Sequence, residues 1–338
     1  MKIEDFQLER FFAKYEFKAP YLLSSSDCES FSVNEILEFA GEEDMGQVWL
    51  GYTESLGDPE LREEIVDLYQ DISTDEVIVT AGAEEAIFVF MNVSLTADDH
   101  VVCMFPAYQS LFEIANSIGC EVSHWELKEE NNWEPDIEEL KAAIQPNTKA
   151  IIINTPHNPT GYLFSDEKLE EVIELAREND LYLFSDEVYK FLEYNEEDRV
   201  VSVCDRYQKG ISLGVMSKSF GLAGLRIGWI ATQDEELYRE FASFKDYTSI
   251  CNSAPSEYLS ILALRNKEKL LERNLEIIEE NLELLDDFFA KYDDIFEWNR
   301  PKAGSIAFPK LLLDEDIEEF CVKLVEETGV LLLPGNYY

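Results

Sequence analysis

The feature that most constrains the fold is a regular alternation of short β-branched runs with longer amphipathic runs, extending from about Asp75 to Asp234. This alternation predicts parallel strands joined by helical crossovers, in a sheet whose two faces are both covered by helices. The expected strands are Glu76–Thr80, His100–Met104, Glu121–Leu127, Lys149–Asn154, Leu181–Ser185, Gly210–Met216 and Ile227–Thr232. The expected intervening helices are Glu84–Leu95, Tyr108–Gly119 and Asp166–Asn179.

The sequence changes character after Asp234, where helical patterns predominate. A helix is expected at Glu235–Tyr247, and a long charged helical stretch follows at Ser256–Tyr292. The remainder predicts a small α/β layer with strands Ile295–Trp298, Ser305–Pro309 and Val330–Leu333 and a helix Asp314–Thr328.

The domain organisation follows from this change of pattern. We predict an N-terminal arm at 1–40 that packs with the small domain, because those residues match neither the strand nor the helix pattern strongly. We predict a large domain at 41–250, and a long connecting helix with a small C-terminal domain at 251–338.

The charge of the chain restricts its partners. The 338 residues include 27 basic and 71 acidic side chains, a formal net charge of −44. Phosphate backbones and anionic membrane surfaces would repel such a protein, so we expect neither nucleic acid nor membrane as a partner. Acidic residues occur throughout the chain, which indicates solvated helix faces, with adaptation to salt as the alternative.

Targeting and metal signals are absent from the sequence. No segment has the ~18 consecutive apolar residues of a spanning helix, and no export signal begins the chain. The six cysteines form no C-x-x-C pair, so we expect buried free thiols and a cytoplasmic location. The three histidines lack metal-ligand spacing; we expect no metal site and a supporting role for His157 in its loop.

Chemistry is expected at the carboxyl ends of the strands, where helix N-termini and loop amides converge in an open parallel sheet. After Thr80, the small-residue turn Ala81–Glu85 leads into a helix whose free amides could hold a phosphate, although an ordinary tight turn has the same pattern. After Met104, Tyr108 could present an aromatic face at this edge or simply pack on it.

Three further strand ends carry polar residues. The turn Thr155–Gly161 is dense in Pro, Asn and Gly, which indicates a fixed backbone that presents Asn158. Asp186 ends the next strand, either as a site carboxylate or as the acidic start of a helix. Lys218 follows the last of these strands, with Arg226 eight residues later, which is typical of a carbonyl-reactive amine in a cation-rich pocket.

Three motifs carry a resemblance to a known family: N-P-T-G at Asn158–Gly161, D-E-V-Y at Asp186–Tyr189 and S-K-S-F-G-L-A-G-L-R-I-G-W at Ser217–Trp229. Over Gly51–Gly335 the chain resembles the class I/II aminotransferases of the aspartate aminotransferase superfamily, which are pyridoxal 5′-phosphate enzymes of fold type I. The resemblance implies a large domain with a mostly parallel sheet between helices and a smaller α/β domain. It also implies a homodimer with shared active sites, in which Tyr52 reaches the cofactor phosphate of the neighbouring subunit.

The resemblance also implies a role for each residue around the cofactor ring. Lys218 would form the Schiff base with the cofactor aldehyde and move the proton between the substrate Cα and the cofactor C4′. Asp186 would pair with the pyridine nitrogen and keep it protonated. Asn158 and Tyr189 would hydrogen-bond the phenolic oxygen of the ring, and Tyr108 would stack on the ring face.

The phosphate would be held by a second group of residues. By the same resemblance, the backbone amides in the turn at Gly82, Ala83 and Glu84 would bind it together with the guanidinium of Arg226.

Two positions depart from the family pattern. Many relatives carry a hydroxyl residue where this chain has Val215, and we expect Ser217 or Ser219 to take over that contact with the phosphate. Relatives also carry an arginine that clamps the substrate α-carboxylate in a segment that follows the stretch resembling Val330–Gly335. No arginine follows Pro334 here, and Arg300 does not match that position, so we expect the chain as given to bind the cofactor but to turn over poorly.

Transamination between an amino acid and a 2-oxo acid is the expected function. The same residues would also serve β- or γ-elimination, α-decarboxylation or cyclisation of an amino acid, so these reactions stay open as alternatives. A non-catalytic sensor and a catalytically silent fragment that binds the cofactor are the alternatives from other classes; the intact Lys218 argues against the sensor. The segment Phe17–Ser30 is where we expect recognition of the substrate side chain.

Overall fold

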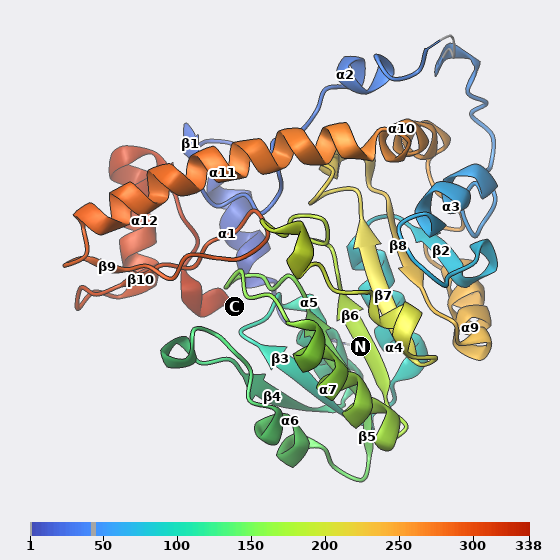
Figure 1. Ribbon diagram of the computed structural model, residues 1–338, viewed down its shortest axis with the longest axis horizontal. Helices are drawn as coiled ribbons and strands as arrows, with labels where there is room; N and C mark the ends of the chain where they lie inside the picture. Colours follow the sequence, from blue (N-terminus) through green and yellow to red (C-terminus); the bar gives the residue numbers. More distant parts are fainter. Residues whose placement is uncertain (1, 42–44) are drawn as a thin grey trace.

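The computed structural model describes residues 2–41 and 45–338, and its centre is a seven-stranded sheet (Figure 1). The strand order is β2-β8-β7-β6-β5-β3-β4, and β8 runs antiparallel to both neighbours while the other pairs are parallel. The strands are β2 Val77–Thr80, β3 His100–Phe105, β4 Glu121–Glu126, β5 Thr148–Asn154, β6 Tyr182–Asp186, β7 Gly210–Val215 and β8 Gly228–Ala231. The predicted mostly parallel sheet is confirmed.

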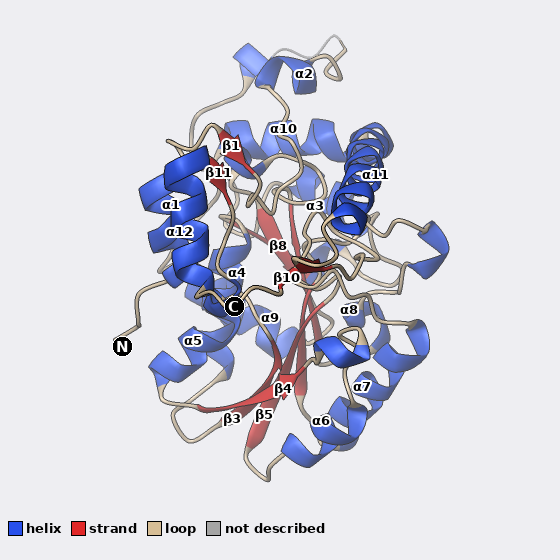
Figure 2. Ribbon diagram, turned by 90° about the vertical axis from the view of Figure 1, so that its left-hand side faces the viewer, coloured by secondary structure: helices blue, strands red, loops and turns tan. Residues whose placement is uncertain are grey.

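Helices cover both faces of the sheet, as Figure 2 shows. The helices of this part are α2 Val33–Leu37, α3 Pro59–Val66, α4 Ala83–Ser94, α5 Ser110–Ile118, α6 Ile137–Ala143, α7 Asp166–Glu178, α8 Val203–Arg206, α9 Glu235–Lys245 and α10 Ala254–Leu264. Their ends follow local sequence preferences. The Ser165 side chain accepts a hydrogen bond from the Lys168 amide at the start of α7, and α5 ends at Gly119 with φ 107°.

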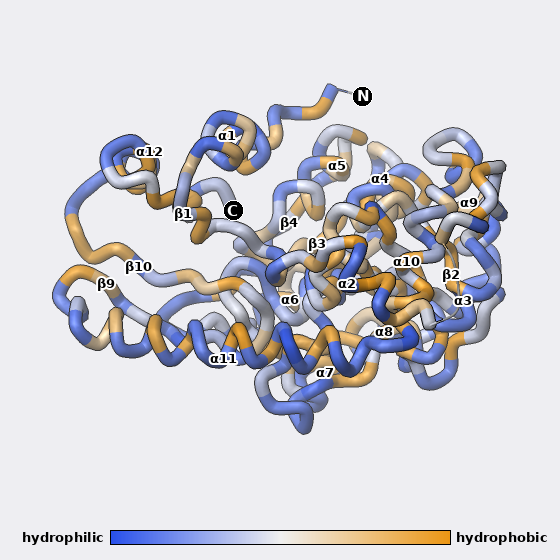
Figure 3. The backbone as a smooth tube through the Cα atoms, turned by 90° about the horizontal axis from the view of Figure 1, so that it is seen from above, coloured by the Kyte–Doolittle hydropathy of each residue, from blue (hydrophilic) through white to orange (hydrophobic). Residues whose placement is uncertain are grey.

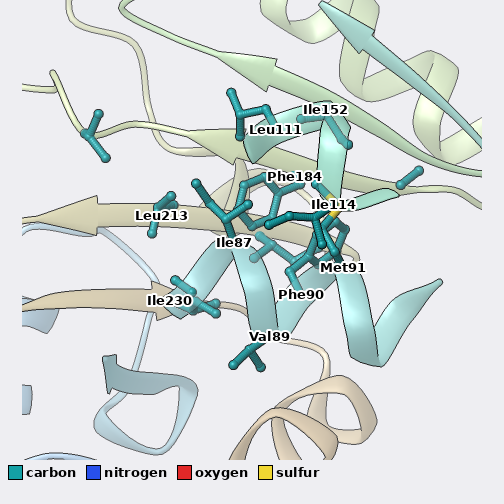
Figure 4. Packing of buried hydrophobic residues seen from close by; sticks show 14 of the residues in the cluster. Ile87, Val89, Phe90, Met91, Leu111, Ile114, Ile152, Phe184, Leu213 and Ile230 are labelled. Carbon is teal, nitrogen blue, oxygen red and sulfur yellow. The ribbon is translucent and has the colours of Figure 1, made fainter. Parts of the chain in front are cut away.

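The large core has one layer on each face of the sheet. In β5, Ile152 packs with the α4, α5 and α9 layer, whereas Ile151 and Ile153 pack with α6, α7 and α8. Figure 4 shows the first layer, where the rings of Phe90 and Phe184 stack with centroids 4.4 Å apart. Because both faces are buried, the central strands have continuous apolar sequences rather than alternating ones.

A second, smaller layer lies beside the sheet and is joined to it by the long helix α11 (Figure 1). Its elements are α1 Gln7–Tyr15, β1 Tyr21–Leu22, α11 Lys267–Lys291, β9 Phe296–Glu297, β10 Lys310–Leu311, α12 Ile317–Thr328 and β11 Val330–Leu331. Phe11 and Tyr15 of α1 pack with Cys321 and Val325 of α12, and β1 pairs in parallel with β11. Figure 3, which colours the backbone by hydropathy, shows hydrophilic and hydrophobic residues alternating along these elements. The exact boundaries 40/41 and 250/251 stay a prediction.

Three details of the predicted secondary structure are wrong. The single helical stretch Ser256–Tyr292 is two helices, because Asn266 leaves helical geometry at φ −121°, ψ 24°. No strand forms at Ser305–Pro309, where the Ser305 hydroxyl donates to the Ser26 carbonyl. Helix α1 was not predicted, since its apolar side depends on packing against α12, which is remote in sequence.

No helix among the described residues is both long enough and apolar enough to cross a membrane. The six cysteines are free, and five of them are buried, as predicted.

Candidate active site

The site lies at the carboxyl ends of β5, β6 and β7, where the sheet register brings polar residues side by side. Asn154 of β5 lies opposite Asp186 of β6. The Asn154 side chain ties the two loops together, because its Nδ2 donates to the Asp186 carbonyl at 2.9 Å and its Oδ1 accepts from the Asn158 amide at 2.6 Å. The loop itself is braced by His157, whose ring nitrogens bond Thr160 Oγ1 and the Pro106 carbonyl, and burial lowers its pKa to about 3. The supporting role predicted for His157 is confirmed.

Asp186 is a buried carboxyl group with little to stabilise its charge. Its side chain is 5% exposed and accepts one hydrogen bond from the Val188 amide at 3.2 Å. Burial raises its pKa to about 7, against the lowering effects of that amide and of Lys218. A carboxyl group in such surroundings becomes fully charged at neutral pH when a cation is placed against it.

Two further polar atoms are buried beside Asp186 without a hydrogen-bond partner of normal geometry in the described part of the chain. They are Oδ1 of Asn158 and the hydroxyl of Tyr189. Buried polar atoms are nearly always paired in native proteins, so a pair of unpaired ones in one loop cluster indicates a ligand position. Tyr338 lies near both: burial raises its pKa, the charge of Tyr189 adds to the rise, and a hydrogen bond with the Asn158 side chain opposes it.

Lys218 lies beyond β7 and is held by the N-terminal segment. Its Nζ donates to Ser26 Oγ at 2.7 Å and forms an ion pair with Asp27 Oδ1 at 2.6 Å. Burial lowers the pKa of Lys218 most, but Tyr189, Asp27 and Asp186 together raise it above its ordinary value. The amine is therefore protonated while these carboxylates face it.

An anion cradle forms where the β2–α4 turn meets Arg226. Helix α4 begins at Ala83, so the amides of Ala83 and Glu84 have no acceptor within the helix. Gly82 has φ 85°, and a Cβ on it would lie 2.4 Å from Nη2 of Arg226, so glycine is what lets the guanidinium reach the helix N-terminus. The Gly82 amide itself donates to the Thr80 carbonyl, and the Glu84 side chain accepts from Ser110 Oγ.

The hydroxyl residues near Lys218 differ from one another. Ser219 Oγ donates to the carbonyls of Val188 and Lys190, which leaves Ser217 as the freer of the two serines expected to replace a hydroxyl at Val215. Ser217 is buried and remains the candidate for that contact.

Tyr108 is partly buried at the start of α5 and packs on Phe6, with ring centroids 5.0 Å apart. Burial raises its pKa, as do the nearby charges of Glu84 and Glu9.

Large apolar side chains are exposed in two segments, 49–52 and 247–250, which come together where the Thr53 hydroxyl donates to the Asn252 carbonyl; these residues form the exposed patch. Tyr52 is 82% exposed, and Trp49, Leu50, Tyr247 and Ile250 are also exposed. The Glu85 side chain connects this patch to the cradle, because it accepts hydrogen bonds both from the Ala81 amide and from Thr248 and Ser249.

Arg300 lies elsewhere: its guanidinium pairs with Asp286 on α11. Sequence reasoning placed Ser26 and Asp27 in the substrate-recognition segment Phe17–Ser30 without giving either a role of its own, and it did not assign Tyr338 to the site. The only signal for the first two was the position of the segment Phe17–Ser30, and nothing in the sequence indicated Tyr338.

Comparison with known proteins agrees with this geometry. The family model for "Aminotransferase class I and II" matches residues 20–338. Capreomycidine synthase of Streptomyces vinaceus is 26% identical over 99% of this chain and 86% of its own length. A probable aspartate aminotransferase of Methanocaldococcus jannaschii is 29% identical over 93% of this chain and 86% of its own.

Solved structures are similar over the whole chain. A PLP-dependent aminotransferase from Streptococcus suis superposes with a TM-score of 0.94 at 34% identity, covering 100% of this chain and 91% of that one. The PLP-dependent cyclase OrfR superposes with a TM-score of 0.91 at 27% identity, covering 100% and 90%.

The side chains of the site fit pyridoxal 5′-phosphate. Its phosphate suits the cradle at Gly82 and Arg226, since both helix amides and a guanidinium bind phosphate. The ring nitrogen suits the carboxyl of Asp186, whose raised pKa shows that its charge lacks a partner. The phenolic oxygen suits the polar atoms of Asn158 and Tyr189 that have no hydrogen bond of normal geometry in the described chain. Lys218 supplies the only ammonium within ion-pair distance of Asp27 in residues 2–41 and 45–338.

Proposed function

The chain belongs to the aminotransferase class I and II family, and we propose that it moves an amino group between an amino acid and a 2-oxo acid with its cofactor carried on Lys218. Its cofactor is pyridoxal 5′-phosphate. The observation that carries the proposal is that the buried carboxyl of Asp186 at the end of β6 and the amine of Lys218 just beyond β7 lie close enough for each charge to shift the pKa of the other group. When bound, the cofactor supplies an electron sink for the substrate Cα.

The work of the protein is to hold charges and protons in place. Asp186 holds a proton on the ring nitrogen, because its buried carboxylate is stabilised by the resulting positive partner. With the cofactor bound, Lys218 would carry it, and its Nζ is the group placed to take the proton from the substrate Cα and to return it. Asn158 Oδ1 and the Tyr189 hydroxyl would hydrogen-bond the phenolic oxygen and so help to orient the cofactor.

The phosphate end anchors the ring. Arg226 and the first-turn amides of α4 neutralise its charge, with Ser217 as a further donor. Tyr108, just before α5, would cover the ring when the cofactor is bound. The exposed patch around Tyr52 supports a homodimer, in which Tyr52 reaches the phosphate bound by the partner.

Cyclisation is the second candidate, because capreomycidine synthase and the cyclase OrfR are similar to this chain over nearly its whole length. The two reactions differ in the fate of the nitrogen. A transaminase transfers the amino group of its substrate to the cofactor and releases a 2-oxo acid. A cyclase returns the original cofactor and keeps the nitrogen in its product.

An absorbance titration of the cofactor-loaded protein with a panel of amino acids tests the proposal. We expect conversion to the pyridoxamine form together with a 2-oxo acid detected by mass spectrometry. Turnover with the cofactor spectrum restored and a cyclic product of unchanged nitrogen content would replace transamination by cyclisation. No spectral change with any amino acid would contradict both.

A further inference from the structure

The segment Ser26–Phe31 is fixed over Lys218 by contacts at both ends. At one end, Ser305 Oγ donates to the Ser26 carbonyl at 2.7 Å. At the other end, the Phe31 amide donates to the Gly221 carbonyl at 3.2 Å, and Arg273 Nη1 donates to the Glu29 carbonyl at 2.6 Å. The position of the segment is therefore set by the fold, and Asp27 at its centre has a defined place.

Asp27 faces the reacting amine from the N-terminal segment. Its Oδ1 lies 2.6 Å from Nζ of Lys218, and its side chain is 29% exposed. In the proposed function the cofactor is carried on the Lys218 amine. Asp27 then no longer has the Lys218 ammonium as an ion-pair partner of its own. Asp186, at the end of β6, would have the ring nitrogen of the cofactor as its charge partner. Asp27 is thus a carboxylate at the substrate side of the pocket that is left without a dedicated cation.

Two more carboxylates come from α1 and the residue that follows it, Glu9 and Glu16. Burial raises the pKa of Glu16, and the charges of Glu9 and Asp27 raise it further, so negative charge gathers around this segment. Glu9 also raises the pKa of Glu84. Arg273 of α11 reaches this segment, but it is paired with Glu29 and lies over the ring of Phe31, 4.2 Å from its centroid.

From this geometry we infer that Asp27 makes the enzyme selective for amino acids whose side chain carries an ammonium or guanidinium group, and disfavours dicarboxylic amino acids. The inference rests on the proposed function, because it needs Lys218 to be engaged with the cofactor. A partly buried carboxylate attracts a cationic side chain and repels a carboxylate at the same place. Asp27 acts on the side chain of the substrate, whereas the reacting atoms are handled by Lys218 and Asp186.

The test measures binding of matched amino acids to the cofactor-loaded protein by calorimetry. L-Lysine and L-norleucine differ by the side-chain ammonium, and L-glutamate supplies the opposite charge. We expect L-lysine to bind about tenfold more tightly than L-norleucine, and L-glutamate to bind weakest. Asp27→Asn should abolish the difference between lysine and norleucine without weakening norleucine. Asp27→Glu should retain it. Glu29→Gln is the matched control, since that carboxylate faces Arg273, and it should leave the preference unchanged.

The possible failures are distinguishable. Equal weakening of all three amino acids in Asp27→Asn would overturn the inference, because Asp27 would then serve the α-ammonium or Lys218 itself. Binding of L-glutamate as tight as that of L-lysine in the unmodified protein would also overturn it. Borohydride reduction of each variant reports separately on Lys218. A labelled Lys218 without side-chain preference defeats the inference alone, whereas an unlabelled Lys218 defeats the proposed function.

Discussion

The cofactor side and the substrate side of the pocket are built in different ways. Asn158, Asp186 and Lys218 follow neighbouring strands, so the parallel sheet brings them together wherever its register forms. The substrate side is closed by contacts between remote segments: Ser26 and Lys218 are 192 residues apart, and Ser26 and Ser305 are 279 apart. Topology therefore fixes the cofactor side, whereas the substrate side depends on where the ends of the chain pack.

The two sides also differ in how their polar groups are satisfied. On the cofactor side, Asn158 Oδ1 and the Tyr189 hydroxyl have no hydrogen bond of normal geometry in the described chain, although Tyr338 and Ser26 lie near them, and no ion pair is formed by Asp186 there. On the substrate side, Ser26 and Asp27 are paired with Lys218. The polar groups of the cofactor side are thus fully paired only when a ligand is bound. On the substrate side, Ser26 and Asp27 already have Lys218 as a partner and exchange it for another when the ligand binds.

The largest expected effect is on the cofactor side, at Asp186. Asp186→Ala should keep the fold and some cofactor binding but reduce the rate of proton abstraction by about 10²–10⁴-fold, because a neutral ring nitrogen withdraws electrons poorly. The rate of proton abstraction in Asp186→Glu should lie between those of the unmodified protein and Asp186→Ala. The measurement is the rate of substrate α-deuterium exchange with solvent. An unchanged rate in Asp186→Ala would make the carboxylate only the start of the following turn.

The raised pKa of Asp186 also predicts a pH dependence of stability. In the cofactor-free protein the folded state keeps Asp186 protonated up to about pH 7, whereas the unfolded chain ionises it near 4. The contribution of this group is therefore fully present below pH 4 and is lost as the pH rises to 7. Relative to the unmodified protein, Asp186→Asn should gain up to about 4 kcal/mol in the free energy of unfolding between pH 4 and pH 7.

Urea denaturation of both cofactor-free proteins across that range measures this gain. Loading the cofactor should reduce the gain, because the ring nitrogen then supplies the cation. If the free energy of unfolding changed with pH in parallel for the two proteins, the raised pKa of the buried Asp186 would be contradicted.

The cradle can be tested with two glycines from the same site. Gly82→Ala places a Cβ 2.4 Å from Arg226 at φ 85°, so cofactor affinity should fall about tenfold to a hundredfold. Gly224→Ala is the matched control, since a Cβ there meets no heavy atom within 4 Å. Equilibrium dialysis with pyridoxal 5′-phosphate compares them. Equal affinities would place the phosphate away from Gly82.

The smallest effect is expected at the exposed patch. Tyr52→Phe should weaken cofactor binding about threefold to tenfold by removing one hydrogen bond to the partner's phosphate. Tyr247→Phe lies in the same patch and should have no effect. Light scattering with cofactor titration over a dilution series checks both variants. A monomer that binds the cofactor tightly would contradict the shared site.

The sequence predicted the sheet and the loops at its edge because those signals are local. Strands such as β5 are buried on both faces, and the turn around Asn158 is rich in Pro and Asn, so pattern and composition suffice. Helix α1 and the contact between Asp27 and Lys218 were not predictable in the same way. Both depend on the packing of α1 against α12 and on the pairing of β1 with β11, which link segments about 310 residues apart.

Covalent labelling tests the central claim most directly. Borohydride reduction of the cofactor-loaded protein, followed by peptide mapping, should place a single label on Lys218, the amine that the sheet edge and Asp27 hold between them. A label on Lys190 or Lys209 instead would contradict the account, because those amines bond the Val200 carbonyl and Asp180 away from the cradle.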